Sequence, residues 1–517
     1  MYSDPSIAVE STQVQCGKFK APLCYSDVCS APSSVNQTIE LFVKLIPANE
    51  PETAMNIWML GDQIGAASDS MEAAMVQLTN KLNGSVNIYT MDPRGSGRST
   101  RLDCAVRTNN PLGYKMDPSQ VASCAQKLER TFGNLAAFSP TSAAHDLFNL
   151  ISKLSNGADT ILYGTIYGAL LVERVMHLAP PDVTGYVLDG PISTTGSYYY
   201  QSNADRDAGE VADAFMELCD QDRVCSSHFK DTLAATIQEI IDNFDNQADS
   251  PCFELMGSIK VNLQNASASS YLRLTNSIML STVLYTWIPQ LVYRLKRCQL
   301  QDVKILKKFV KFLNAYDYSE SPLYSITLQG LINYSEFWEK PTPSLAILKK
   351  RFTDSTAGEG TYDELPLYCA FSKEQSKACA KYDFGKYKAQ GIIYKRDQYW
   401  NASVSIPNQA SVLVLSSKLD MAAPHKYTQR LLESLDGDNK KLISFDFGSG
   451  GTLSTTFVDL RSFEKDTCAL EVLASYIRNN GDLASLDQSC LDKMPEFEMI
   501  LEDFNADHLM TLINTTI

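Results

Sequence analysis

The sequence predicts an α/β fold in which helices flank a mostly parallel sheet and a long helical segment interrupts that sheet. In the first two hundred residues, short apolar stretches alternate with helical patterns, which is typical of parallel strands joined by crossover helices. Helical periodicity then dominates from about 193 to 399, and strand patterns return after residue 410. Together these three observations indicate a sheet whose two parts are separated by a helical insertion.

The predicted strands differ in how much of each is buried. The earliest, 38–46, alternates apolar and polar residues, as a half-exposed strand does. The later strands are short and apolar on both faces, as in the interior of a parallel sheet. They cover 56–60, 86–91, 160–163, 186–189, 411–416 and 442–447, and helical patterns cover 70–82, 142–154, 167–178 and 425–435.

Three segments follow from this layout. We expect residues 1–192 to form the first part of an α/β core, 193–399 a largely helical cap, and 400–517 the second part of the core. In open α/β sheets, ligands bind at the carboxyl ends of the strands. A functional site is therefore predicted at those strand ends, beneath the cap.

The composition excludes several classes of partner. The 517 residues include 45 basic and 60 acidic side chains, a net charge of −15, which argues against binding to nucleic acid or to an anionic membrane. The longest apolar stretch, 278–288, is too short to span a bilayer, and Pro289 follows it. We therefore expect a soluble protein with no nucleic-acid partner and no membrane span.

Cysteines and glycosylation sequons indicate an oxidising, secretory context. The chain has 13 cysteines, and its N-terminal residues Met1–Pro5 are polar, with no signal-peptide core. We expect an extracellular glycoprotein whose presequence is not part of this chain. The six asparagines in sequons are Asn36, Asn83, Asn265, Asn333, Asn401 and Asn514.

A resemblance to a known family begins at one turn. Residues 92–99 read Asp-Pro-Arg-Gly-Ser-Gly-Arg-Ser, and they resemble the D-x-R-G-x-G-x-S turn of prolyl-iminopeptidase-type α/β-hydrolases. The chain more closely resembles the secreted tripeptidyl-aminopeptidase-like branch, and the likeness continues through 163–178, 187–190, 412–420, 424–427 and 451–456. The resemblance implies an α/β-hydrolase fold with an inserted cap and a serine-peptidase type of active site.

The resemblance implies a Ser-Asp-His triad with the serine at the centre of a G-x-S-x-G elbow. Here the elbow reads Gly164-Thr-Ile-Tyr-Gly168, so Ile166 occupies the position of the nucleophile. Isoleucine carries no hydroxyl, thiol or amine that could attack a substrate. The acid is present as Asp420, whereas Gly450 stands where the histidine is expected.

The oxyanion loop also departs from the family pattern. The family reads G-G-P-G after the first core strand, with backbone amides that face the oxyanion. This chain reads Asp62-Gln-Ile-Gly65, which places Asp62 and Gln63 in that loop, and a carboxylate there would repel the developing negative charge. Nucleophile, base and oxyanion loop have all changed, which indicates a catalytically degenerate member of the family.

Ile166 raises a conformational question of its own. A nucleophile elbow holds its central residue at positive φ, which is unfavourable for a β-branched side chain. With no reaction to require that conformation, we expect the turn to have relaxed, or the isoleucine to fill the former cleft with apolar contacts.

Two other functions stay open at this point. The chain could be an active hydrolase with a non-standard nucleophile; Thr165, Ser416, Ser417 and Ser449 are the nearby hydroxyls, with no histidine expected beside the serines. It could also be a decoy that binds a peptide or small ligand. The histidines show no metal-ligand spacing, so no metal or other cofactor is expected. A binding or assembly subunit without hydrolytic activity is the preferred hypothesis.

Cysteine spacing suggests five disulfides, although connectivity does not follow from sequence alone. Cys16, Cys24 and Cys29 remain, and 13 cysteines cannot all pair within one chain. One of these three is therefore a candidate for a bridge to a partner or to a second copy. The suggested pairs are Cys104–Cys124, Cys219–Cys225, Cys252–Cys298, Cys369–Cys379 and Cys468–Cys490.

Overall fold

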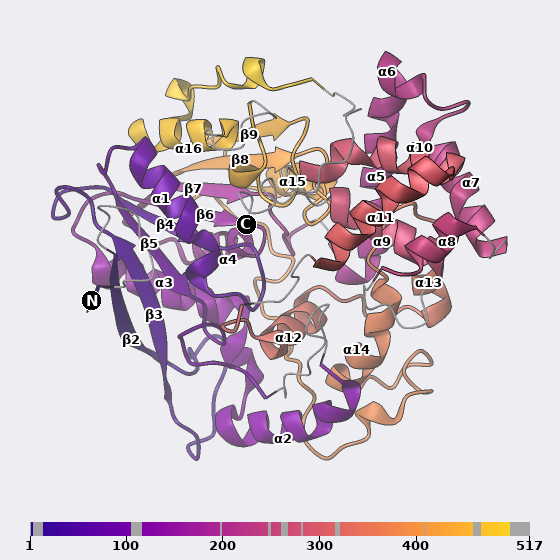
Figure 1. Ribbon diagram of the computed structural model, residues 1–517. Helices are drawn as coiled ribbons and strands as arrows, with labels where there is room; N and C mark the ends of the chain where they lie inside the picture. The colour runs from indigo at the N-terminus through magenta and orange to yellow at the C-terminus, as the bar shows by residue number, and fades with distance from the viewer. Residues whose placement is uncertain are drawn as a thin grey trace.

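The fold is described from a computed structural model of the chain (Figure 1). It describes residues 2–3, 14–104, 116–196, 199–246, 250–259, 267–280, 283–315, 321–407, 409–458 and 467–496. Two of the predicted glycosylation sites, Asn265 and Asn514, lie outside these ranges. Asn36, Asn83 and Asn401 are exposed and Asn333 is half-buried, and their glycosylation stays a prediction.

The predicted α/β fold is confirmed by a single sheet of nine described strands in the order β1-β2-β3-β5-β4-β6-β7-β8-β9. The first three strands and the pairing of β3 with β5 are antiparallel, and every pairing from β5 through β9 is parallel. The strands are β1 (Tyr2–Ser3), β2 (Gln15–Pro22), β3 (Thr38–Ile46), β4 (Asn56–Leu60), β5 (Asn87–Asp92), β6 (Thr160–Thr165), β7 (Val183–Asp189), β8 (Ser411–Ser417) and β9 (Lys440–Phe445).

Helices cover both faces of this sheet because alternate residues of each buried strand point to opposite sides. On β6, Ile161 and Tyr163 belong to a core that includes helices α1 and α16, whereas Leu162 belongs to the core formed with α2, α3, α4 and α15. The core helices are α1 (Glu72–Lys81), α2 (Val121–Phe132), α3 (Pro140–Leu154), α4 (Tyr167–Leu178), α15 (His425–Ser434) and α16 (Cys468–Arg478).

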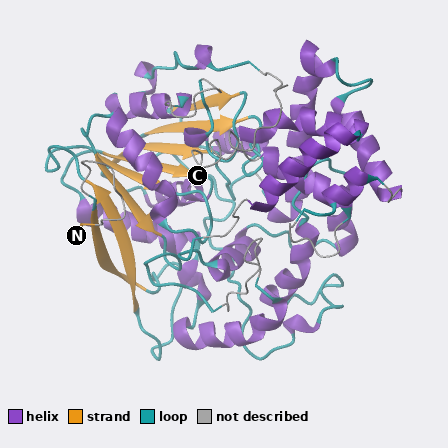
Figure 2. Ribbon diagram, viewed as in Figure 1, coloured by secondary structure: helices purple, strands orange, loops and turns teal. Residues whose placement is uncertain are grey.

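Between β7 and β8 the described residues form helices and loops, which lie to the right of the sheet in Figure 2. Helices α5 to α11 share a hydrophobic core of their own, whereas α12, α13 and α14 pack against the core on one side of the sheet. The helices are α5 (Ala204–Gln221), α6 (Arg223–Ser226), α7 (Leu233–Asn246), α8 (Pro251–Met256), α9 (Ala268–Leu280), α10 (Ile288–Arg297), α11 (Leu300–Ala315), α12 (Ile326–Glu336), α13 (Leu345–Thr353) and α14 (Leu365–Ser372).

The six disulfides of the structure include one that spacing did not suggest. Five of them join the pairs named from the sequence, and the sixth joins Cys24 to Cys29. The idea that Cys24 or Cys29 bridges to another chain is therefore wrong, because the two are bonded to each other. Cys16 is fully buried in β2, which removes it from the surface that a partner could reach. No helix within the described ranges is long and apolar enough to cross a membrane.

Candidate functional site

The turn between β6 and α4 keeps the geometry of a nucleophile elbow. A Cβ on Gly164 would lie 2.2 Å from the carbonyl oxygen of Gly168, and a Cβ on Gly168 would lie 2.4 Å from the carbonyl oxygen of Leu60. Both positions therefore require glycine. Ile166 sits between them at φ 49° and ψ −100°, at the amino end of α4.

The expectation that this turn has relaxed is wrong. Ile166 keeps the positive φ of a nucleophile, a conformation that costs a β-branched residue about 1–3 kcal/mol. The two flanking glycines explain why: their close contacts with neighbouring backbone fix the path of the chain on both sides. The side chain of Ile166 is half-buried and packs against the hydrophobic core. This agrees with the other expectation, that the isoleucine makes apolar contacts.

Asp420 lies beyond the carboxyl end of β8 and is fully buried. Its Oδ1 accepts backbone hydrogen bonds from Ala422 (2.9 Å) and Ala423 (3.0 Å). Its Oδ2 is buried and has no hydrogen-bond partner within the described part of the chain. Burial raises the pKa of this carboxyl group, and nearby backbone N–H groups, that of Ala423 first, partly counteract the rise.

The turn after β9 carries Gly450 at the expected position of the base. Gly448, Gly450 and Gly451 have φ angles of 125°, 59° and 99°, which glycine adopts at little cost. A Cβ on Gly451 would lie 2.9 Å from Oγ1 of Thr165, whereas a Cβ on Gly450 would meet no described atom within 4 Å. The space for a side chain is present at Gly450, and the sequence places none there.

Ile166, Asp420 and Gly450 come together at the carboxyl ends of the strands, as the resemblance implies. The point that a Cβ on Gly190 would occupy lies 3.1 Å from Oδ2 of Asp420 and 3.9 Å from Cγ1 of Ile166. The backbone N–H of Ile166 donates to the carbonyl oxygen of Asp189 at 2.9 Å. Asp420 thus lies between Ile166 and the backbone of Gly450, whose N–H partly counteracts the rise that burial causes in the pKa of that carboxyl group; that the three are triad positions stays a prediction.

The oxyanion loop is held by the backbone of Asp62. The N–H of Tyr167, which follows the elbow centre, donates to the carbonyl oxygen of Asp62 at 3.1 Å, and the N–H of Gly168 donates to that of Gly61 at 2.9 Å. In the hydrolase arrangement, the N–H after the nucleophile binds the oxyanion, so this donor is already occupied. Asp62 is half-buried and Gln63 is exposed. Burial raises the pKa of Asp62.

Asp189, at the end of β7, is a site residue that the sequence did not single out. It is fully buried, and it accepts hydrogen bonds from the Tyr163 hydroxyl (2.6 Å) and from the backbone N–H of Thr452 (3.0 Å). Burial raises its pKa to about 6, although these hydrogen bonds act in the opposite direction. Its place at the end of a buried strand, within the family-like segment 187–190, was the signal that could have identified it.

One serine and one histidine outside the expected triad lie within hydrogen-bond distance of each other. Contrary to the expectation that no histidine lies near Ser416, its Oγ lies 2.9 Å from Nδ1 of His425. Ser416 is fully buried on β8, and burial lowers the pKa of His425. The pair joins β8 to α15, and the hydroxyl has no surface at which a substrate could be attacked.

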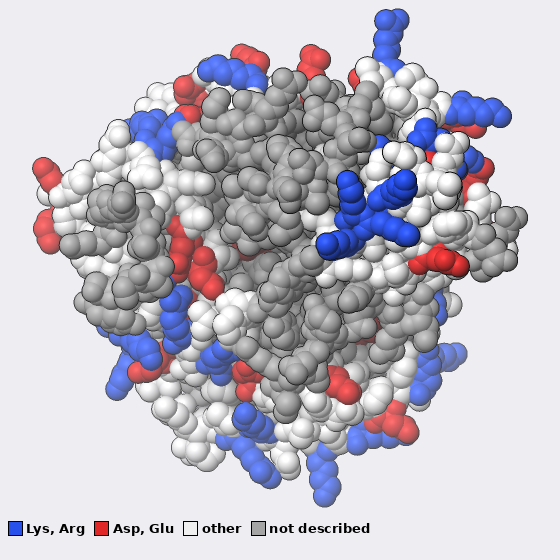
Figure 3. Space-filling model, viewed as in Figure 1, with Lys and Arg blue, Asp and Glu red and all other residues white. Residues whose placement is uncertain are grey.

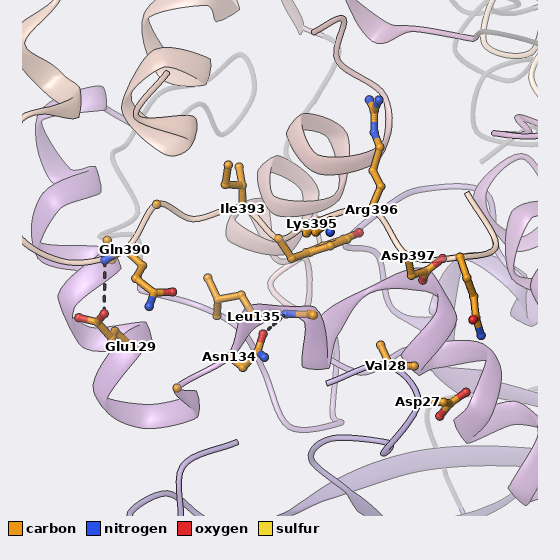
Figure 4. A pocket seen from close by; sticks show the side chains of 16 residues that line it. Asp27, Val28, Glu129, Asn134, Leu135, Gln390, Ile393, Lys395, Arg396 and Asp397 are labelled. Atoms are coloured by element: carbon orange, nitrogen blue, oxygen red, sulfur yellow. Dashed lines mark hydrogen bonds between the residues drawn. The ribbon is translucent and has the colours of Figure 1, made fainter. Parts of the chain in front are cut away.

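One well-defined pocket lies elsewhere, between the end of α2 and the extended segment 390–398 (Figure 4). It has a volume of about 510 Å³ and is lined by residues of both charges, among them Asp27, Glu129 and Lys395. None of the triad positions lines it. Among the described residues there is also no group of three or more His, Cys, Asp or Glu that could hold a metal ion.

The strand order, the elbow and the positions that converge on it define the class: the chain has an α/β-hydrolase fold. No protein-family model matches the sequence, and no curated protein matches it. Similar solved structures include a peroxisomal alpha-beta-hydrolase from Saccharomyces cerevisiae, with 10% identity, a TM-score of 0.37 and coverage of 97% of this chain and 96% of that one.

Proline iminopeptidase from Mycobacterium smegmatis is 12% identical, with a TM-score of 0.34 and coverage of 86% of this chain and 97% of that one. Monoacylglycerol lipase from Paleococcus ferrophilus is 14% identical, with a TM-score of 0.33 and coverage of 85% and 99%. At these identities and TM-scores, neither fold nor activity of this chain is taken from the likeness.

Proposed function

We propose that this chain is a catalytically inactive, secreted relative of the tripeptidyl-aminopeptidase-like α/β-hydrolases, and that it acts by binding a partner. The observation that carries this proposal is an elbow that keeps its strained geometry around Ile166, a residue without a nucleophilic atom. A strained turn with no reaction to serve is consistent with a fold inherited from a hydrolase and retained for its shape.

The loss of activity is supported by three independent features. Ile166 cannot attack a carbonyl carbon, Gly450 cannot accept a proton, and the N–H of Tyr167 is already bonded to Asp62. Removing triad members from a serine hydrolase lowers kcat by a factor on the order of a million. In this proposal, residues 193–399 form the cap. The described sequons that would carry glycans are those at Asn36, Asn83, Asn333 and Asn401.

A partner-binding role is supported by the surface of α11 (Figure 3), where basic side chains gather on an otherwise acidic protein. Lys304, Lys307, Lys308 and Lys311 are exposed and recur with helical spacing, so they share one side of the helix. Leu300, at the start of the same helix, is 86% exposed. An exposed leucine beside a row of lysines fits a protein partner with an acidic surface.

A serine-directed fluorophosphonate probe tests the loss of activity. The purified protein should remain unlabelled under conditions that label an active serine hydrolase completely. Stoichiometric labelling at any residue, Ser416 included, would establish an active enzyme instead. A pull-down from secreted material then tests the binding role, with a retained stoichiometric partner as the expected result and a strictly monomeric protein as the contrary one.

A further inference from the structure

Three carboxyl groups lie at the carboxyl ends of strands in the parallel part of the sheet, with no positive charge paired to them among the described residues. Asp62 follows β4, Asp189 ends β7 and Asp420 follows β8. None of the three forms an ion pair with a Lys, Arg or His within the described ranges, and Asp189 and Asp420 are fully buried. Buried carboxylates are normally paired or fully hydrogen-bonded, so the charge of this site is incomplete.

Hydrogen bonding at the site is incomplete as well. Three other buried side-chain oxygens, like Oδ2 of Asp420, have no well-formed hydrogen bond among the described residues: Oγ1 of Thr165, Oγ of Ser449 and Oγ1 of Thr452. The hydroxyls of Thr165 and Thr452 still lie close enough to Tyr163 and Asp189, respectively, to counteract part of the rise that burial causes in their pKa. The four side chains are 0 to 7% exposed. Buried polar atoms in native proteins almost always have a partner, which makes four unsatisfied atoms around one turn a sign of a missing ligand.

These atoms lie on or beside the turn that carries Gly450, the expected histidine position. Thr165 Oγ1 lies 2.9 Å from where a Cβ on Gly451 would be, and Ser449 and Thr452 flank the same glycines. Next to them, a Cβ on Gly450 would meet no described atom within 4 Å. Gly450, Ile166 and Asp62 are each partly exposed, so a small molecule can reach this space from the surface.

We infer that the space vacated at Gly450 binds a small organic cation that carries N–H groups, either a protonated amine or an imidazolium, with Asp420 as its counter-charge. Such a cation supplies the two things that the site lacks, which are a positive charge and several hydrogen-bond donors. Water would satisfy the hydroxyls but would leave the carboxylates unbalanced. A single metal ion fits less well, because the described residues bring no three metal-ligating side chains together.

This inference rests on the proposed loss of the catalytic histidine, and it extends that proposal by naming the chemistry that the former active site recognises. The cation can be a free amine or a lysine or histidine side chain of a bound peptide, since both present the same group. The two sources are distinguished by comparing methylamine with peptides that carry a single central lysine between blocked ends.

The test measures the melting temperature of the intact protein against increasing imidazole, methylammonium or tetramethylammonium chloride at constant ionic strength. Ligands that bind only the native state raise the melting temperature with concentration. Imidazole and methylammonium should raise it and tetramethylammonium should not, because it has charge but no N–H group. Asp420→Asn should weaken the apparent affinity at least tenfold, whereas Asp446→Asn, at an exposed aspartate paired with Lys418, should leave it unchanged.

Two further outcomes decide the inference. Gly450→Ala, which fills the space with a methyl group, should reduce binding even if Asp420→Asn fails to fold. Equal effects of all three cations, undiminished binding by Asp420→Asn, or no response to any cation would overturn the inference. None of these results depends on labelling by fluorophosphonate, so failure here is distinguishable from failure of the proposed loss of activity.

Discussion

The Tyr163 hydroxyl donates a hydrogen bond of 2.6 Å to Oδ2 of Asp189, and both side chains are buried at the ends of neighbouring strands. This contact links the floor of the elbow to the turn that carries Gly450, because the same carboxyl group also accepts the backbone N–H of Thr452. Asp189 therefore ties these two turns together, and its titration should be visible in the stability of the whole protein.

Stability should fall as pH rises through the range in which Asp189 ionises. Its pKa is raised from 3.8 in the unfolded chain to about 6 in the fold, so the native state binds more protons between these values. By linkage, the stability that protonated Asp189 contributes is fully present below pH 3.8 and is lost as pH rises through about 6. The free energy of unfolding should fall by roughly 3 kcal/mol across this range.

Asp189→Asn should remove this part of the pH dependence, because asparagine does not ionise and its Oδ1 can accept the same hydrogen bonds. Urea unfolding at several values between pH 4 and 7 measures it, with Asp446→Asn as the exposed control. A variant with the full pH slope of the native chain would show that Asp189 does not titrate in this range.

Replacing Ile166 by glycine should increase stability. Glycine adopts φ 49° without strain, which removes a cost of about 1–3 kcal/mol, while the loss of a half-buried side chain gives back part of that gain. We expect a net increase of about 1 kcal/mol in the free energy of unfolding. Ile166→Ala is the matched control, since it loses the packing but keeps the strain, and it should destabilise.

Restoring the two missing side chains should not restore hydrolysis. In the double variant Ile166→Ser with Gly450→His, the nucleophile and base return, but the Tyr167 N–H still donates to Asp62 and is unavailable to an oxyanion. One lost oxyanion donor lowers kcat by about 100- to 1,000-fold. Assays with aminopeptidase and ester substrates check this. Activity within tenfold of an active serine aminopeptidase would mean that the loop rearranges when substrate binds.

Arg94→Lys should destabilise the fold strongly. Arg94 forms two hydrogen bonds of 2.6 Å to the carboxylate of Asp146, and both side chains are fully buried. Lysine cannot make the paired contact, and breaking a buried ion pair costs about 3–5 kcal/mol. Chemical unfolding measures the loss. Arg98→Lys, at a partly exposed arginine of the same turn, is the control and should cost far less.

Charge reversal on α11 should abolish capture of the proposed partner. Lys304→Glu, Lys308→Glu and Lys311→Glu together change the sign of one side of the helix without altering its buried residues. The amount of partner retained by this variant in a pull-down should be at least tenfold lower than with the native chain. With the native chain, added salt should already reduce the amount retained. The same three changes at Lys377, Lys381 and Lys388, exposed lysines after α14, should have no effect.

Several elements were predictable because their pattern is local. The strands 38–46 and 56–60 and the helix 167–178 have the bounds that apolar periodicity gave them. β9 begins and ends two residues earlier than predicted. Its pairing with β8 stops at Phe445, which lies opposite Ser417, the last residue of β8. Strand β2 was not predicted: Gly17, Lys18 and Pro22 give a weak strand pattern, and antiparallel pairing with β3 fixes it.

The sequence by itself determined that no hydroxyl stands at position 166 and no imidazole at position 450, because the identity of a side chain is a local property. Only the tertiary structure decided what became of the site. The strained elbow persists because Gly164 lies against the backbone of Gly168 and Gly168 lies against that of Leu60, and the Tyr167 N–H is occupied because it donates to the carbonyl oxygen of Asp62. Likewise, Asp189 acquires its raised pKa, and Ser416 its histidine, from segments far apart in the chain. Side-chain identity is local, whereas strain, burial and hydrogen-bond partners arise only when the strand ends are packed together.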